Sequence, residues 1–248
     1  MSAPALLLLA GSIAAFLIGL SKGGLSLVAA LGVPILALVI SPVRAAAILL
    51  PVYVISDLAG LWLYRREFSK ENLWILIPAG AFGIALGWAT ASRISDRGIS
   101  LLIGLVGIGF CVNAWRTRHH PPAPHPADPK RGLLWGTLMG FASFVSHSGA
   151  PLYQVYVLPQ RLPKMVYAGT TAIVFASVNA LKLIPYWALG QLSTSNLAVA
   201  AYLLLPAVAG TLLGFRLVRI LPANRYFLVV QVLLLAVSLR LVLKATGF

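Results

Sequence analysis

The sequence predicts an all-α integral membrane protein, a polytopic helical bundle built from two repeats. Of the 248 residues, 60% are hydrophobic and 10% are charged, whereas soluble domains carry roughly 25% charged residues. A soluble protein of this composition would lack the polar side chains to cover its surface, but a bilayer solvates an apolar exterior. Two further observations support this fold class, because the apolar residues fall into discrete segments and the order of these segments repeats once.

The apolar segments alternate with short polar stretches along the whole chain. In the first half they are 5–20, 25–40, 45–64, 73–91 and 99–115. In the second half they are 132–145, 150–158, 166–187, 197–220 and 226–243. Five of them have about the 20 residues that a helix needs to cross a hydrocarbon core; these are 45–64, 73–91, 166–187, 197–220 and 226–243. The first two segments of each half are predicted to be short, as a broken or re-entrant pair, and such matched pairs are typical of transporter binding sites.

A stretch rich in proline and histidine separates the two halves. We therefore predict a first transmembrane repeat at 1–117, a cytoplasmic linker at 118–131 and a second transmembrane repeat at 132–248. Prolines interrupt any helix that would align His119, His120 and His125, so a solvated loop is favoured over a metal site. The single cysteine, Cys111, allows no intramolecular disulfide. We expect no metal and no cofactor.

Three short fragments support duplication because they recur in the same order. The pairs are 32–34 with 149–151, 69–73 with 193–197, and 83–88 with 210–215. Each match alone is weak, but their common order indicates an internal repeat.

Positive charge predicts the orientation of the two repeats. The net charge is +14, and no basic patch comes with the exposed aromatic residues of a nucleic-acid surface. If the repeats are inverted, most of the lysines and arginines between segments lie on one side of the membrane, whereas parallel repeats divide them almost equally. Basic loops stay in the cytoplasm. We therefore expect inverted repeats in a bacterial inner membrane, with both termini in the periplasm.

The junction between the first two segments is the first candidate binding site. Gly23 and Gly24 would let the backbone approach a ligand closely, and they precede a helix start, which favours an anion. Lys22 adds a full positive charge. The alternative is a short cytoplasmic turn with a lysine that only sets topology.

The corresponding junction in the second half is the second candidate. It contains His147, Ser148 and Gly149 just before a predicted helix start. Here His147 takes the place of Lys22 as the cation, and because histidine titrates near neutral pH it is also a candidate for proton coupling. The alternative is an interfacial histidine with its hydrogen bonds satisfied.

Polar residues inside the spans form the third set of candidates. Asp57 is an acid at membrane depth, which is costly and therefore indicates function; we expect it to bind the coupling cation. Asn179 and Lys182 lie in the segment of the second repeat that corresponds to the segment of Asp57, and Thr170 and Thr171 lie earlier in it. All four are candidate substrate ligands. The alternatives are a structural ion pair for Asp57 and a lysine that snorkels to the interface for Lys182.

Three stretches of the chain resemble the TauE/SafE family of membrane anion transporters. They are 57–87, 140–159 (GFASFVSHSGAPLYQVYVLP) and 160–190, which includes GTTAIVFASVNALKLIPYWALG. The resemblance implies transport of sulfite, a sulfonate or a related organic anion, driven by a proton or sodium gradient. The chain differs from the family's usual run of glycines by Lys22, which bears on the anion that fits.

The sequence therefore predicts a secondary transporter for a small anion, embedded in lipid, with no catalytic residues. Two alternatives stay open. An uncoupled anion channel would conduct without needing Asp57. An intramembrane hydrolase would draw on Ser146, His147, Ser148 and Asp57, although the serine-containing elbow typical of hydrolases is missing from the sequence.

Overall fold

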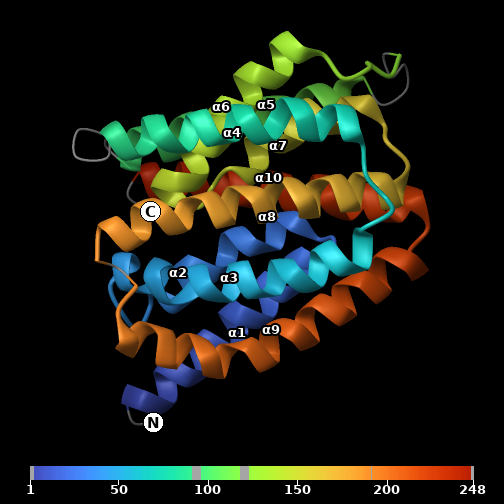
Figure 1. Ribbon diagram of the computed structural model, residues 1–248. Coiled ribbons are helices and arrows are strands. Elements are labelled where there is room, and N and C mark those ends of the chain that lie inside the picture. The colour runs from blue at the N-terminus through green and yellow to red at the C-terminus, as the bar shows by residue number, and fades with distance from the viewer. Residues whose placement is uncertain (1–2, 91–95, 118–122, 191, 247–248) are drawn as a thin grey trace. The chain divides into compact units, whose positions relative to one another are not determined.

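The computed structural model describes residues 3–90, 96–117, 123–190 and 192–246. Within these ranges the chain is helical and contains no strand. Six helices are long and apolar enough to cross a membrane (Figure 1). They are α1 (Ala3–Lys22), α3 (Pro42–Tyr64), α4 (Lys70–Thr90), α8 (Lys164–Ala188), α9 (Thr194–Ile220) and α10 (Ala223–Thr246). The predicted all-α, polytopic membrane fold is confirmed.

The other helices are shorter or less apolar. They are η1 (Ser26–Leu31), α2 (Gly32–Leu36), α5 (Asp96–Arg116), α6 (Pro129–Ser146), α7 (Ala150–Val157) and η2 (Leu158–Gln160). In each half a long helix is thus followed by a short broken one, η1 with α2 and α7 with η2. The prediction that segment 5–20 is short is wrong, because α1 has 20 residues and extends beyond both ends of that segment.

Helix α6 begins earlier than the apolar pattern indicated. Asp128 caps it by accepting hydrogen bonds from the backbone N–H groups of Lys130 (2.9 Å) and Arg131 (3.4 Å), and Pro129 occupies its first turn. Proline and a capping aspartate are both favoured at a helix start. The end of the predicted linker is therefore helical, whereas Arg118, His119 and His120 lie outside the described residues.

The chain forms two compact units, and each unit takes helices from both predicted repeats. Unit 1 comprises Met1–Phe68 and Ala168–Leu221, and unit 2 comprises Ser69–Tyr167 and Pro222–Phe248. The boundaries of the compact units therefore differ from the predicted division into 1–117 and 132–248. That division stays a prediction about how the chain arose by duplication.

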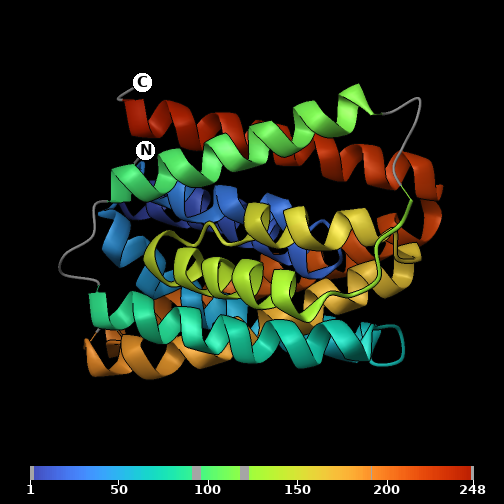
Figure 2. The same ribbon diagram turned by 90° about the horizontal axis from the view of Figure 1, so that it is seen from above.

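Glycines hold the main helix pairs of each unit close together. In unit 1, α1 lies beside α9 (Figure 1), and a Cβ atom added at Gly19 would collide with the carbonyl oxygen of Ala207. In unit 2, α4 packs on α6, and a Cβ atom at Gly140 would collide with the carbonyl oxygen of Gly80. Helix α5 also lies along α10 (Figure 2). Small residues permit such close backbone approach between membrane helices.

These contacts correspond between the units. Gly210 faces the carbonyl oxygen of Phe16 in unit 1, and Gly83, its counterpart in the predicted repeat, faces that of Thr137 in unit 2. The pair α1–α9 therefore makes the same contact as the pair α6–α4, which is what duplication predicts. The inverted orientation in a membrane stays a prediction.

The repeated fragments 69–73 and 193–197 also have the same structural role, because each begins with a serine that caps a helix. Ser69 and Ser193 each accept a hydrogen bond, at 3.4 Å, from the backbone N–H three residues later, that of Asn72 and Asn196 respectively. Serine is a favoured N-cap residue because its hydroxyl satisfies a free N–H of the first turn. The two fragments start α4 and α9 in the same way.

Candidate functional site

Three charged side chains are buried in the described part of the chain, and all three lie in unit 1. Lys22 is 5% exposed, Asp57 3% and Lys182 1%. They come from three helices, α1, α3 and α8. A buried charge inside a membrane protein is costly and is retained where it pairs or functions. We call these residues, together with Asn179, the charged cluster.

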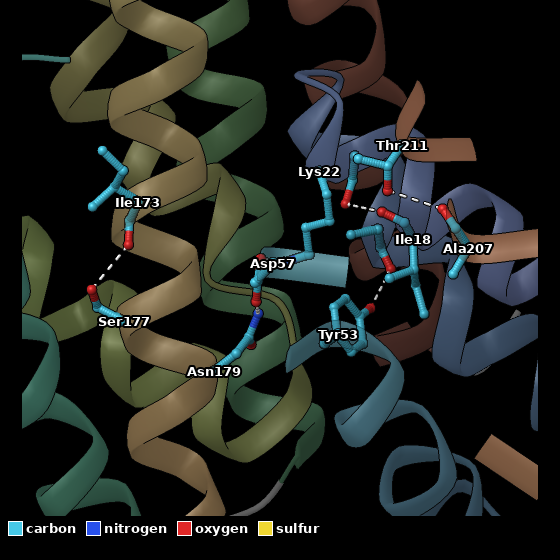
Figure 3. Close-up of polar contacts among 11 residues, drawn as sticks. Ile18, Lys22, Tyr53, Asp57, Ile173, Ser177, Asn179, Ala207 and Thr211 are labelled. Carbon is cyan, nitrogen blue, oxygen red and sulfur yellow. Dashed lines mark hydrogen bonds and ion pairs between the residues drawn. The ribbon is translucent and has the colours of Figure 1, made fainter. Parts of the chain in front are cut away.

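Asp57 is the centre of the charged cluster. The Nζ atom of Lys22 lies 2.7 Å from Oδ1 of Asp57, and Nδ2 of Asn179 donates a hydrogen bond to Oδ2 at 2.8 Å (Figure 3). Both carboxylate oxygens are therefore held. Asp57 and Asn179 are each the sixteenth residue of their helix. If α3 and α8 correspond in the repeat, as predicted, the two residues in contact are equivalent.

Lys182 completes the charged cluster from the next turn of α8. It follows Asn179 by three residues, a spacing that puts both side chains on one helix face. The side chain is almost fully buried, so Lys182 does not snorkel to a surface. With both lysines protonated, two positive charges face one carboxylate.

The local fold brings Lys22 to Asp57. Lys22 is the last residue of α1, and its Nζ lies 5.0 Å from the ring centroid of Tyr53 on α3. The Tyr53 hydroxyl donates to the carbonyl oxygen of Ala29 in η1 at 2.8 Å. Gly60 permits a close approach, since a Cβ there would lie 3.1 Å from the carbonyl oxygen of Lys22. Lys22 is thus a buried partner of Asp57, and the reading as an exposed topology lysine is wrong.

The glycines of the first junction have a structural role that the sequence did not reveal. The N–H groups of Gly23 and Gly24 donate to the carbonyl oxygens of Gly19 (3.0 Å) and Ser21 (3.1 Å). These two N–H groups are thus used in the turn that ends α1, and a role of Gly23 and Gly24 in substrate binding stays a prediction. The Tyr64 hydroxyl donates to the Gly23 carbonyl oxygen.

Substitution of Gly24 would therefore disturb the fold. It has φ +124°, which L side chains rarely adopt, and an added Cβ would lie 2.6 Å from Val218. A valine here is therefore expected to destabilise the fold and not only to block a ligand.

The second junction lies in unit 2 and closes the end of α6. The backbone N–H groups of His147 and Ser148 both donate to the carbonyl oxygen of Ala142, the latter at 3.3 Å. A Cβ at Gly149 would lie 2.5 Å from the carbonyl oxygen of Met139. Ser148 therefore does not offer its N–H to an anion. The predicted binding site shared by the two junctions stays a prediction, as do the roles of His147 in binding and proton coupling.

Contacts between glycines and carbonyl groups also correct the predicted equivalence of Lys22 and His147. Gly19 and Gly140 make matching contacts, so the residue three positions later in α6, Ser143, corresponds to Lys22. Ser143 is buried. In this position unit 2 has a neutral hydroxyl where unit 1 has an ammonium group.

Thr170 and Thr171 are buried in α8 but lie far from Asp57. They precede Asn179 by eight or nine residues, which is roughly 12 Å along a helix axis. They therefore do not belong to the shell around the carboxylate, and their predicted contact with substrate stays a prediction.

Unit 2 has its own buried polar side chains, and those that the structure describes are neutral. The amides of Asn72 and Gln160 bond reciprocally: Nδ2 of Asn72 donates to Oε1 of Gln160 at 2.8 Å, and Nε2 of Gln160 donates to Oδ1 of Asn72 at 3.0 Å. The Tyr167 hydroxyl donates to Oε1 of Gln154. Among the residues described, no group of three or more His, Cys, Asp or Glu side chains could hold a metal ion.

Sequence reasoning selected every member of the charged cluster but missed two of its contacts. It did not connect Lys22 with Asp57, and it did not single out Tyr53. The spacing of Tyr53 and Asp57, four residues apart on one helix, is a signal that could have placed the ring beside the acid.

Comparison with known proteins gives one match. The family model described as "Sulfite exporter TauE/SafE" matches residues 7–241 of the chain. No similar curated protein and no similar solved structure was found.

Proposed function

Because the chain belongs to the sulfite exporter TauE/SafE family, we propose that it is a secondary transporter for sulfite, a sulfonate or a similar small anion. The family is one of membrane transporters and not of enzymes, so the hydrolase alternative is wrong. The chain is a multi-pass membrane protein. We place it in a bacterial inner membrane with both termini in the periplasm, because this orientation keeps most basic loops in the cytoplasm.

One observation carries the proposal: the buried charged groups of the described chain converge, and they are unbalanced. When both lysines are protonated, Lys22 and Lys182 place two positive charges against the single negative charge of Asp57. An uncompensated charge in a poorly solvated interior is unfavourable. A bound anion would neutralise the excess and gain attraction from both lysines.

The resident carboxylate suits a site that must also release its anion. A cation and an anion about 4 Å apart attract by about 4 kcal/mol at an effective dielectric constant near 20. Asp57 already holds Lys22 at 2.7 Å, so an incoming anion competes with it for the ammonium group. This competition weakens substrate binding and permits release.

The same competition provides a route to ion coupling at Asp57. A proton or a sodium ion on the carboxylate would weaken its hold on Lys22 and leave the lysine free for the anion. Each ligand would then favour binding of the other, which is positive coupling between two sites. Cation and anion would therefore move in the same direction.

Uptake into proteoliposomes tests the proposed function. The purified chain should accumulate labelled sulfite, with competition from thiosulfate and alkylsulfonates, when a proton or sodium gradient is applied. Asp57→Asn should abolish gradient-driven accumulation and leave exchange of anion for anion. If no anion tested is transported or exchanged, the proposal fails. Steady anion currents in planar bilayers without any cation gradient would indicate a channel instead.

A further inference from the structure

We propose that the charged cluster selects its substrate by net charge, and that Asp57 makes the site prefer anions carrying one negative charge. This inference rests on the proposed function, because it assumes that the charged cluster binds the transported anion. It goes further by assigning a specificity to one residue.

The preference follows from the charges that are buried. Of the acids whose side chains the structure describes, Glu67 and Glu71 are exposed and Asp128 is partly exposed, so Asp57 is the buried carboxylate among these four. With Lys22 and Lys182 protonated, the cluster has one excess positive charge. A monoanion brings the total to zero, whereas a dianion leaves one uncompensated negative charge inside the protein.

Two contacts hold the carboxylate of Asp57 in the charged cluster. Lys22 holds one carboxylate oxygen at 2.7 Å and Asn179 holds the other at 2.8 Å. Figure 3 shows Asp57 between these two side chains. The repulsion between the carboxylate and a second negative charge on the substrate is therefore built into the site.

Two neighbouring side chains already have polar partners of their own. Tyr53 flanks Lys22 with its ring, and its hydroxyl is directed to the carbonyl oxygen of Ala29. Asn179 has its amide committed to Asp57. Formal charge therefore dominates the choice between anions, because Coulomb energies grow where water is excluded.

A series of four proteins varies the charge of the cluster and keeps side-chain size similar. The formal charge is +1 in the wild type, +2 in Asp57→Asn, zero in Lys182→Gln, and +1 again in the double variant. The preference for a monoanion should therefore be lost in Asp57→Asn and return in the double variant, even though the double variant carries more changes.

The experiment uses two probes whose charges do not change near neutral pH, methanesulfonate (one negative charge) and ethane-1,2-disulfonate (two). Each competes with labelled sulfite in anion exchange by full-length protein in proteoliposomes, with no cation gradient. The ratio of their inhibition constants should shift by about tenfold or more toward the disulfonate in Asp57→Asn, because one cluster charge changes. It should return to within about threefold of wild type in the double variant.

Matched controls separate the effect of a charge within the cluster on this ratio from the effect of the protein's total charge and from misfolding. Glu71→Gln and Lys70→Gln remove the same charges at exposed positions and should leave the ratio unchanged. Asp57→Glu keeps the charge and should keep the monoanion preference in whatever fraction folds, as judged by gel filtration. An unchanged ratio in a folded, exchanging Asp57→Asn protein would overturn the charge-selection inference while leaving anion transport in place. No exchange of any anion by the wild type would instead overturn the proposed function.

Discussion

Among the described residues, unit 1 buries two lysines and the carboxylate of Asp57, whereas the buried polar side chains of unit 2 are neutral and include the reciprocally bonded amides of Asn72 and Gln160. Both units use the same scaffold, since Gly19 against Ala207 matches Gly140 against Gly80. They differ in the residue at one corresponding position, because the buried Lys22 of unit 1 corresponds to the buried Ser143 of unit 2. The two units therefore share helix contacts, and they differ in that, among the residues described, the buried charged side chains all lie in unit 1.

The largest effect should come from removing one partner of the ion pair. Lys22→Met leaves the Asp57 carboxylate buried without its cation, which costs about 3–5 kcal/mol. We expect a marked fall in the thermal unfolding midpoint of the purified protein and loss of transport. The double variant Lys22→Met with Asp57→Asn should recover most of the stability, because no unpaired carboxylate remains.

Transport distinguishes a functional pair from a structural one. If the charged cluster binds substrate, the stable double variant should still fail to accumulate sulfite. Recovery of both stability and gradient-driven transport would show that Lys22 and Asp57 only support the fold, and the proposed coupling role would be abandoned.

The next largest effect tests whether the two units share one scaffold. Valine at Gly19 or at Gly140 would overlap a facing carbonyl oxygen, and overpacking of this kind costs about 3 kcal/mol. Both variants should lower the unfolding midpoint by similar amounts. Gly109→Ala is the control, because nothing lies within 4 Å of a Cβ there, and alanine should be neutral or slightly stabilising in this helix. A large loss at one glycine only would break the correspondence.

A smaller effect is expected from the neutral pair of unit 2. Asn72→Ala removes both hydrogen bonds between the two amides and leaves Gln160 with its bond to the Tyr156 carbonyl oxygen (3.3 Å), at a cost of about 1–3 kcal/mol. We expect lower stability, measured by thermal unfolding, with an unchanged ratio of inhibition constants for methanesulfonate and ethane-1,2-disulfonate. A change in that ratio would show that unit 2 also takes part in anion selection.

Much of the fold could be predicted because its signals are local. Apolar length identified α3, α4, α8, α9 and α10, whereas the capping serines at 69 and 193 were recognised only as members of a repeated fragment. The start of α6 was missed because Lys130 and Arg131 look like loop residues, while the capping by Asp128 is visible only in the structure. Local apolar patterns therefore predicted the helices but not the residues at which they begin and end.

The residues of the candidate site were predicted from the sequence, but the contacts between them were not. Burial cost alone identified Asp57, Asn179 and Lys182, whose residue types are rare at membrane depth. The pairing of Asp57 with Lys22 depends on how α1 packs beside α3, which no local pattern encodes. Gly23 and Gly24 suggested a ligand because glycine permits close approach, but what they approach is helix α9 and the side chains of Tyr64 and Val218.

The last prediction concerns orientation and should leave stability and transport unchanged. Lys70 and Thr194 occupy the same position after the capping serines of α4 and α9, and both are exposed. Inverted repeats place equivalent residues on opposite sides of the membrane. With Cys111 replaced by serine, a cysteine at Thr194 should react with a membrane-impermeant thiol reagent in whole cells, whereas a cysteine at Lys70 should react only after the cells are opened. A cysteine at Pro124, in the linker, should behave like the one at Lys70 and serves as the cytoplasmic reference. Labelling of positions 70 and 194 from the same side would show parallel repeats, and the two units would then owe their matching contacts to something other than an inverted duplication.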